Sequence, residues 1–279
     1  MSAFEHDGHR IAYTVHGEGP RTCVLIHGLL FTQRLHERLA ADLAGRGHRV
    51  VTIDLLGHGA SERPRAMQEY SMAAFARQVV GLLDHLEVET AVVGGMSLGA
   101  NTTLEVAALA PDRLQGMIVE MPVLDHALVG CAVAFTPAML AMTFGEPAMR
   151  IVQAVCRRVP RLPWFPDQLV DLLRQDPGPS GAVLQGLFFA RIAPPRELRR
   201  TFTAPTLIIG HRADPVHPFS DSGALHDELV GSRLIQASSI LELRLTPERL
   251  TGEIAAFLDE CWAPAMVTAE RAPRAVGAA

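Results

Sequence analysis

Two patterns of hydrophobic positions alternate along the first 120 residues. Short apolar runs occur at residues 23–26, 50–53, 91–94 and 117–119. The segments between them carry apolar residues every three or four positions, as in residues 71–86. A short apolar run predicts a buried strand, and the wider spacing predicts an amphipathic helix. The alternation therefore predicts an α/β fold, with a mostly parallel, doubly wound sheet that helices cover on both faces.

The alternation stops at Pro122 and returns after about residue 200. The intervening segment has helical pieces, many prolines and no predicted strand. Strand and helix patterns then resume at residues 206–209, 220–230, 233–235 and 247–258, with Thr246 as the expected N-cap of the last helix. This organisation predicts one core domain, formed by residues 1–121 and 201–262, into which a helical cap of residues 122–200 is inserted. The tail, residues 263–279, is rich in Ala, Arg and Pro and is predicted to be disordered.

An uncharged stretch, residues 127–144, lies at the start of the predicted cap. It is barely long enough to cross a bilayer, and Gly130 and Pro137 are expected to interrupt it. We therefore expect a pair of buried helices that line a pocket. The unbranched methionines of this stretch would adapt to acyl groups of varied shape.

Composition narrows the classes of function. The chain has 279 residues, 48% of them hydrophobic, and a net charge of -5, without a basic stripe that would indicate nucleic acid binding. Its four cysteines form no C-x-x-C pattern, and the first residues lack the apolar core of a secretory signal. These features predict free thiols in a reducing cytoplasm and indicate no zinc or redox motif.

The strongest chemical signal is the turn Gly95-Met96-Ser97-Leu98-Gly99, which joins a predicted strand to a predicted helix. Its pattern, G-x-S-x-G, places a serine hydroxyl above the carboxyl edge of a sheet. Glycines on either side remove Cβ atoms that such a tight turn cannot accommodate. The alternative interpretation is a serine in an ordinary turn. Further motifs at the ends of other predicted strands make this alternative weaker.

Three further motifs each follow directly after a predicted strand. They are His27-Gly28-Leu29, then Asp54-Leu55-Leu56-Gly57-His58-Gly59-Ala60-Ser61, and then Gly210-His211-Arg212-Ala213-Asp214. Together with the serine turn, they make the chain resemble the α/β-hydrolase fold family from about residue 10 to residue 260. The resemblance implies an α/β-hydrolase core with a cap and a carboxylic ester hydrolase activity of the esterase or lipase kind. It also implies a small-molecule substrate and no metal or organic cofactor.

The resemblance also implies roles for individual residues. Ser97 would be the nucleophile, the backbone N–H groups of Leu29 and Leu98 would form the oxyanion hole, and Asp214 would orient an imidazole. In this family the histidine at the position of His27 is usually structural. We assign neither His27 nor His58 a proton transfer.

The histidine that usually completes the triad is missing. It should follow the last strand, but residues 234–244 contain no histidine. Three hypotheses stay open. His217, three residues after Asp214, could serve as the base; His126, Glu120 or Glu242 could contribute instead; or the pocket could lack a base altogether.

These hypotheses lead to different functions. With a base, Ser97 would form an acyl-enzyme and the protein would cleave an ester or thioester of an apolar acid. Without one, the same scaffold would be a ligand-binding protein that does not hydrolyse. A third alternative is a lyase or cyclase of this fold that forms no acyl-enzyme. The sequence favours the hydrolase, with Ser97, Asp214 and His217 as its catalytic residues.

Overall fold

The computed structural model describes residues 1–162 and 164–263, apart from the side chain of Trp164. All of the predicted tail except its first residue lies outside the described residues. The centre of the molecule is an eight-stranded sheet in the order β1-β2-β4-β3-β5-β6-β7-β8. The strands are β1 (Ser2–His6), β2 (His9–His16), β3 (Thr22–Ile26), β4 (Arg49–Asp54), β5 (Ala91–Met96), β6 (Leu114–Glu120), β7 (Thr206–His211) and β8 (Ser232–Ala237). The six strands from β4 to β8 in this order are parallel, and β2 and β1 pair antiparallel at one edge.

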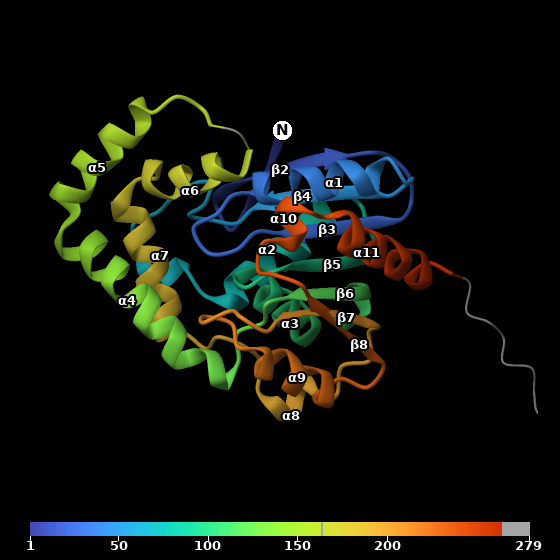
Figure 1. Ribbon diagram of the computed structural model, residues 1–279. Coiled ribbons are helices and arrows are strands. Elements are labelled where there is room, and N and C mark those ends of the chain that lie inside the picture. The colour runs from blue at the N-terminus through green and yellow to red at the C-terminus, as the bar shows by residue number, and fades with distance from the viewer. Residues whose placement is uncertain (163, 264–279) are drawn as a thin grey trace, which may run out of the picture.

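Helices cover both faces of the sheet, as the alternation predicts (Figure 1). One face packs against α1 (Glu37–Ala44), α10 (Glu242–Leu245) and α11 (Glu248–Cys261), and the other against α2 (Met72–His85), α3 (Leu98–Leu109) and α9 (Phe219–Glu228). Successive residues of a strand point to opposite faces, so Leu25 joins the cluster with α1 and α11 while Ile26 joins the cluster with α2. The predicted fold class is confirmed.

The segment between β6 and β7 forms helices at the left of Figure 1, beside one end of the sheet. They are α4 (Leu128–Phe144), α5 (Glu146–Arg158), α6 (Trp164–Arg174) and α7 (Pro177–Phe189). The short α8 (Arg196–Arg199) also belongs to this segment but lies at the bottom of Figure 1, beside α9. Short 3-10 turns lie at Gln33–His36, Met67–Glu69, Pro111–Arg113 and Asp125–Ala127. We call the helices α4 to α7 the cap. The domain boundaries at residues 122 and 200 stay predictions.

The expected pair of buried helices in this region is wrong. Residues 128–144 form one helix, and Met142 is its only fully buried residue. Pro137 leaves the carbonyl group of Val133 without its helical donor, but Val133 is 72% exposed, so water can reach that group. Gly130 permits a close approach, because a Cβ atom there would lie 2.8 Å from the carbonyl oxygen of Pro215.

The expected N-cap of the last helix is also displaced. Pro247 occupies the N-cap position of α11 without a side-chain hydrogen bond. The N–H of Thr246 instead donates to the carbonyl oxygen of Glu242 at 2.9 Å and closes α10. The hydrophobic pattern does not predict the short helix α10. Because Thr246 closes α10, it does not serve as the N-cap of α11.

Candidate active site

The turn after β5 holds Ser97 in a conformation that few residues adopt. Its φ is 53° and its ψ is -107°, and its N–H donates to the carbonyl oxygen of Glu120 at 2.8 Å. A Cβ atom on Gly95 or Gly99 would collide with the carbonyl oxygen of Ile26. The expectation that both glycines remove Cβ atoms from a crowded turn is thus confirmed. The turn points the Ser97 hydroxyl beyond the carboxyl edge of the sheet.

The structure brings Ser97, His217 and Asp214 together. Ser97 Oγ lies 2.8 Å from His217 Nε2, and His217 Nδ1 lies 2.8 Å from Asp214 Oδ2. An ionised carboxylate only accepts hydrogen bonds, so Nδ1 carries the proton and Nε2 is free to accept the serine hydroxyl. This is the hydrogen-bond geometry that a serine, a base and an orienting acid require.

Asp214 also shapes the loop that carries His217. Its Oδ1 accepts the N–H groups of Val216 at 2.8 Å and of His217 at 2.9 Å. Burial would raise the pKa of the Asp214 carboxyl, but the hydrogen bonds and charge of His217, with the two backbone donors, outweigh it and lower the pKa. Asp214 is therefore both a turn residue and the partner of the imidazole, and it is ionised at neutral pH.

The other three candidate residues have partners elsewhere. His126 Nδ1 lies 2.8 Å from Asp221 Oδ1, and its side chain is 60% exposed. Glu120 pairs with Arg244 at 2.7 Å, and Glu242 pairs with Arg249 at 2.8 Å. None of these side chains forms a hydrogen bond with Ser97 in the described part of the chain.

Arg244 comes from the segment in which the family usually has its histidine. Its Nη2 donates to Glu120 Oε2 at 2.7 Å and lies 3.2 Å from Met96 Sδ, and both charged side chains are buried. A buried ion pair thus lies behind the serine turn. Sequence reasoning missed this pair, although the absence of a histidine from residues 234–244 was a signal that the region had changed.

The two predicted oxyanion donors lie beside Ser97. Leu29 and Leu98 line the same apolar pocket as Ser97, and Leu98 is the first residue of α3. The first N–H groups of a helix have no partner within it, and neither of these two N–H groups has a protein acceptor among the described residues. Both groups therefore stay the candidate oxyanion donors.

The side chains of His27 and His58 form hydrogen bonds with backbone groups. His27 Nδ1 donates to the carbonyl oxygen of Gly28 at 2.8 Å, and its Nε2 accepts the N–H of Leu55 at 3.1 Å. His58 Nδ1 donates to the carbonyl oxygen of Leu56 at 3.0 Å. Burial lowers the pKa of both imidazoles and keeps them neutral, which agrees with the structural role assigned to them.

A third buried imidazole, His36, makes acid destabilisation a testable consequence. Burial, followed by the charge of Arg244, lowers its pKa to about 3. The unfolded chain binds a proton near pH 6.5 while the folded chain does not, so stability is lost as pH falls below that value. We expect His36 alone to lower the free energy of unfolding by about 2 kcal/mol between pH 7.5 and pH 5, and His27 and His58 to act in the same direction.

Urea unfolding at the two pH values tests this expectation. His36 Nε2 donates to the carbonyl oxygen of Ile26 at 3.0 Å, and a glutamine amide can do the same without titrating. The variant His36→Gln should therefore lose about 2 kcal/mol less than the wild type over this range. An equal loss in both proteins would contradict the assignment.

An apolar pocket of about 210 Å³ opens beside Ser97. Most of its lining side chains are apolar. They come from the loop after β3, the starts of α2 and α3, the helices α4 and α7, and the two segments that join the cap to the core. The lining includes Leu29, Leu98, Val123, Leu128, Phe135, Leu184, Leu187 and Ile192.

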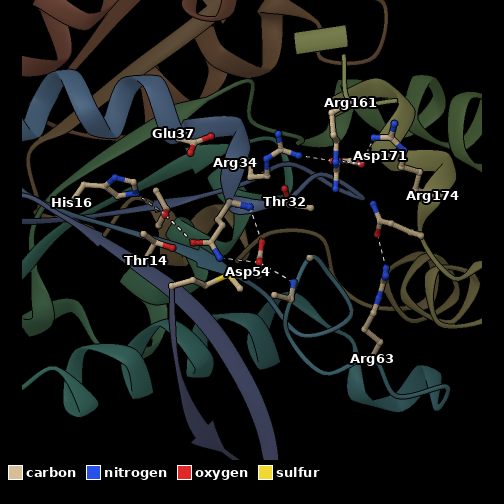
Figure 2. A pocket seen from close by; sticks show the side chains of 16 residues that line it. Thr14, His16, Thr32, Arg34, Glu37, Asp54, Arg63, Arg161, Asp171 and Arg174 are labelled. Carbon is tan, nitrogen blue, oxygen red and sulfur yellow. Dashed lines mark hydrogen bonds and ion pairs between the residues drawn. The ribbon is translucent and has the colours of Figure 1, made fainter. Parts of the chain in front are cut away.

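A second, polar cavity of about 590 Å³ lies between the core and the cap, and Ser97 does not line it (Figure 2). Arg34 from the core donates to Asp171 of α6 at 2.9 Å, and Arg161 and Arg174 converge on the same carboxylate at 2.8 and 2.9 Å. The side chain of Gln175 donates to the carbonyl oxygen of Leu30, next to one predicted oxyanion donor. Arg34 thus joins α6 to the core, and Gln175, just before α7, joins the cap to Leu30.

The comparisons with known proteins agree with this geometry. Residues 22–206 match the family model described as alpha/beta hydrolase fold. The chain belongs to the α/β-hydrolase fold family.

In the part that the structure describes, no group of three or more His, Cys, Asp or Glu side chains is placed to hold a metal ion.

Individual proteins match this chain over part of its sequence or in its fold. The chain is 37% identical over 112 residues to an uncharacterized protein of Mycobacterium tuberculosis, and 34% identical over 114 residues to epoxide hydrolase B of that organism. Each match covers 40% of this chain and 32% of the relative, so the matched segment spans about a third of the relatives' length. The enol-lactonase from Burkholderia xenovorans LB400 has a TM-score of 0.75, with 20% identity over 92% of this chain and 100% of the other. That likeness shows the fold.

Proposed function

We propose that this protein is a serine hydrolase that cleaves an ester or thioester of an apolar acid. One observation carries the proposal: Ser97, His217 and Asp214 form a continuous chain of two 2.8 Å hydrogen bonds. Membership of a hydrolase family and the apolar lining of the pocket beside Ser97 support it. The pocket volume of about 210 Å³ favours an acyl group of short or medium length.

In the first half of the reaction, Ser97 Oγ attacks the substrate carbonyl carbon while His217 Nε2 takes the hydroxyl proton. The N–H groups of Leu29 and Leu98 stabilise the oxygen that becomes negative, at about 3 kcal/mol for each donor. His217 then gives its proton to the leaving alcohol or thiol as the carbonyl carbon–leaving group bond breaks. The acyl group stays on Ser97.

In the second half, water replaces the alcohol or thiol. His217 Nε2 takes a proton from water as its oxygen attacks the acyl carbon, and then returns that proton to Ser97 Oγ as the acyl–serine bond breaks. Throughout, the ionised Asp214 holds Nδ1–H and stabilises the imidazolium that forms in each half. The free acid leaves, and the enzyme regains its starting protonation state.

Hydrolysis of p-nitrophenyl butyrate by the wild type and Ser97→Ala tests the proposal. We expect release of p-nitrophenol by the wild type alone, and a fluorophosphonate adduct, seen by intact mass, on the wild type alone. Equal turnover by Ser97→Ala would refute the proposal. Saturable ligand binding without turnover would favour the binding-protein alternative, and turnover without a trappable acyl-enzyme would favour a lyase or cyclase.

A further inference from the structure

The outer side of α4 is an exposed apolar stripe. Val129, Val133, Pro137, Leu140 and Phe144 follow each other at helical spacing, and Val133 and Phe144 are 72% and 80% exposed. The stripe spans 15 residue steps, or about 22 Å. The segment Asp125–Phe144 is the one described helix long and apolar enough to cross a membrane, and only 11% of it is buried. An exposed apolar surface of this length is unfavourable in water and is typical of an interaction surface.

The stripe has a counterpart on the next helix. After Gly145 the chain enters α5, where Pro147, Ile151 and Val155 lie on one side at helical spacing. All three are exposed, Ile151 by 68%. Figure 1 shows α4 and α5 along the outer edge of the cap, away from the sheet. We call the two exposed stripes together the outer cap face.

Two arginines beside the outer cap face have no carboxylate partner among the described residues, although the chain as a whole carries -5. Residues 128–161 contain four arginines, of which Arg150 pairs with Glu146 and Asp176, and Arg161 pairs with Asp167 and Asp171. Arg157 and Arg158 make hydrogen bonds to backbone carbonyl groups and no ion pair with a described carboxylate. Their guanidinium groups, at the C-terminal end of α5, are available to external anions.

The opposite side of α4 lines the pocket of the proposed active site. Leu128, Cys131, Ala132 and Phe135 face that pocket, and Met142 packs against Leu184 of α7. The same helix therefore presents one apolar side to an external surface and the other to Ser97. An apolar molecule held at the outer cap face is one helix diameter from the pocket, about 10 Å.

We propose that the outer cap face docks this protein on the surface of an anionic phospholipid bilayer. The helices α4 and α5 lie along the interface, with the apolar stripes among the acyl chains and Arg157 and Arg158 against the phosphate groups. The packing of α4 against α7 requires that it lies on the membrane and does not cross it. The inference goes beyond the proposed hydrolysis and does not depend on it.

Charge favours a bilayer over a second copy of the chain. Two copies joined through this face would bring Arg157 and Arg158 of each copy together, and no described carboxylate pairs with these arginines. Anionic headgroups would neutralise the same arginines. A binding surface that combines exposed apolar side chains with arginines at its border is typical of helices at a lipid interface.

Sedimentation with sucrose-loaded vesicles tests the proposal. We expect the wild type to sediment with vesicles of phosphatidylcholine and phosphatidylglycerol, and much less with phosphatidylcholine alone or in high salt. Val133→Asp should weaken binding about tenfold or more, whereas Val230→Asp, at an exposed valine outside the cap, should not. Arg157→Gln with Arg158→Gln should also weaken binding, and Arg46→Gln with Arg200→Gln serves as the charge-matched control.

Two readouts separate docking from folding and from catalysis. Thermal melting and hydrolysis of a soluble p-nitrophenyl ester should be the same in Val133→Asp and the wild type, because Val133 lines no part of the active-site pocket. Sedimentation is measured without substrate, so a failed esterase test leaves the docking test intact. A wild type that does not sediment at low salt would overturn the proposal. So would equal sedimentation of Val133→Asp, or a dimer in light scattering that Val133→Asp dissociates.

Discussion

Replacement of His217 by alanine is expected to lower kcat/KM for p-nitrophenyl butyrate by about 10⁴-fold or more. His217 Nε2 is the group that lies 2.8 Å from Ser97 Oγ, and without it the hydroxyl keeps its proton and stays a weak nucleophile. The assay compares wild type and His217→Ala at pH 8 under conditions of low substrate concentration. Added imidazole should restore part of the lost rate, because it can occupy the space that the side chain leaves.

Matched variants show whether the loss is specific. His226→Ala removes an exposed histidine whose Nδ1 contacts Ser232 Oγ at 2.8 Å, far from the chemistry, and should keep the wild-type rate. Asp214→Asn should lower the rate by about 10³- to 10⁴-fold, because an amide can hold the wrong tautomer of the imidazole. A His217→Ala variant with a tenth or more of wild-type activity would show that another group is the base.

The core was predicted from the sequence because its strands, helices and turns depend on residues that are close together along the chain. The helix α3 begins directly after the glycine-rich serine turn, as predicted, and it ends at Leu109, two residues before Pro111. His217 was predicted as one of three alternatives because it is three residues from Asp214 and follows the same strand. In both cases the information lies within a few residues of chain.

Features that depend on distant residues were not predicted. Glu120 and Arg244 are 124 residues apart, so no local pattern shows that they form a pair. The uncharged segment 127–144 was assigned to buried helices because an apolar sequence does not show what each side of a helix contacts. The polar contacts of Arg34 and Gln175 between the cap and the core were missed for the same reason.

The loop after β7 explains how the site can work with its histidine in an unusual place. Pro215 and Pro218 restrict the backbone on either side of His217, and Asp214 Oδ1 binds two N–H groups of the same loop. Acid and base thus belong to one short, braced segment. Their relative position depends on that loop, whereas a histidine after β8 would have to be placed by a second loop.

The segment after β8 does not have to supply the base, and it carries Arg244 instead. Replacement of Arg244 is expected to have the largest effect on stability. Arg244→Met leaves Glu120 as a buried carboxylate without its cation, which should lower the free energy of unfolding by about 3–5 kcal/mol. Urea unfolding at pH 8 measures this change. Arg21→Met, which breaks the exposed pair of Arg21 with Asp259, should cost about 1 kcal/mol or less.

A double-mutant cycle separates the ion pair from the packing of its side chains. If Glu120 and Arg244 stabilise the fold mainly by neutralising each other, Glu120→Met combined with Arg244→Met should destabilise less than Arg244→Met alone. Additive losses would instead show that the two side chains act independently. Because the carbonyl oxygen of Glu120 accepts the N–H of Ser97 at 2.8 Å, the single variant should also lower kcat, and the double variant should recover part of it.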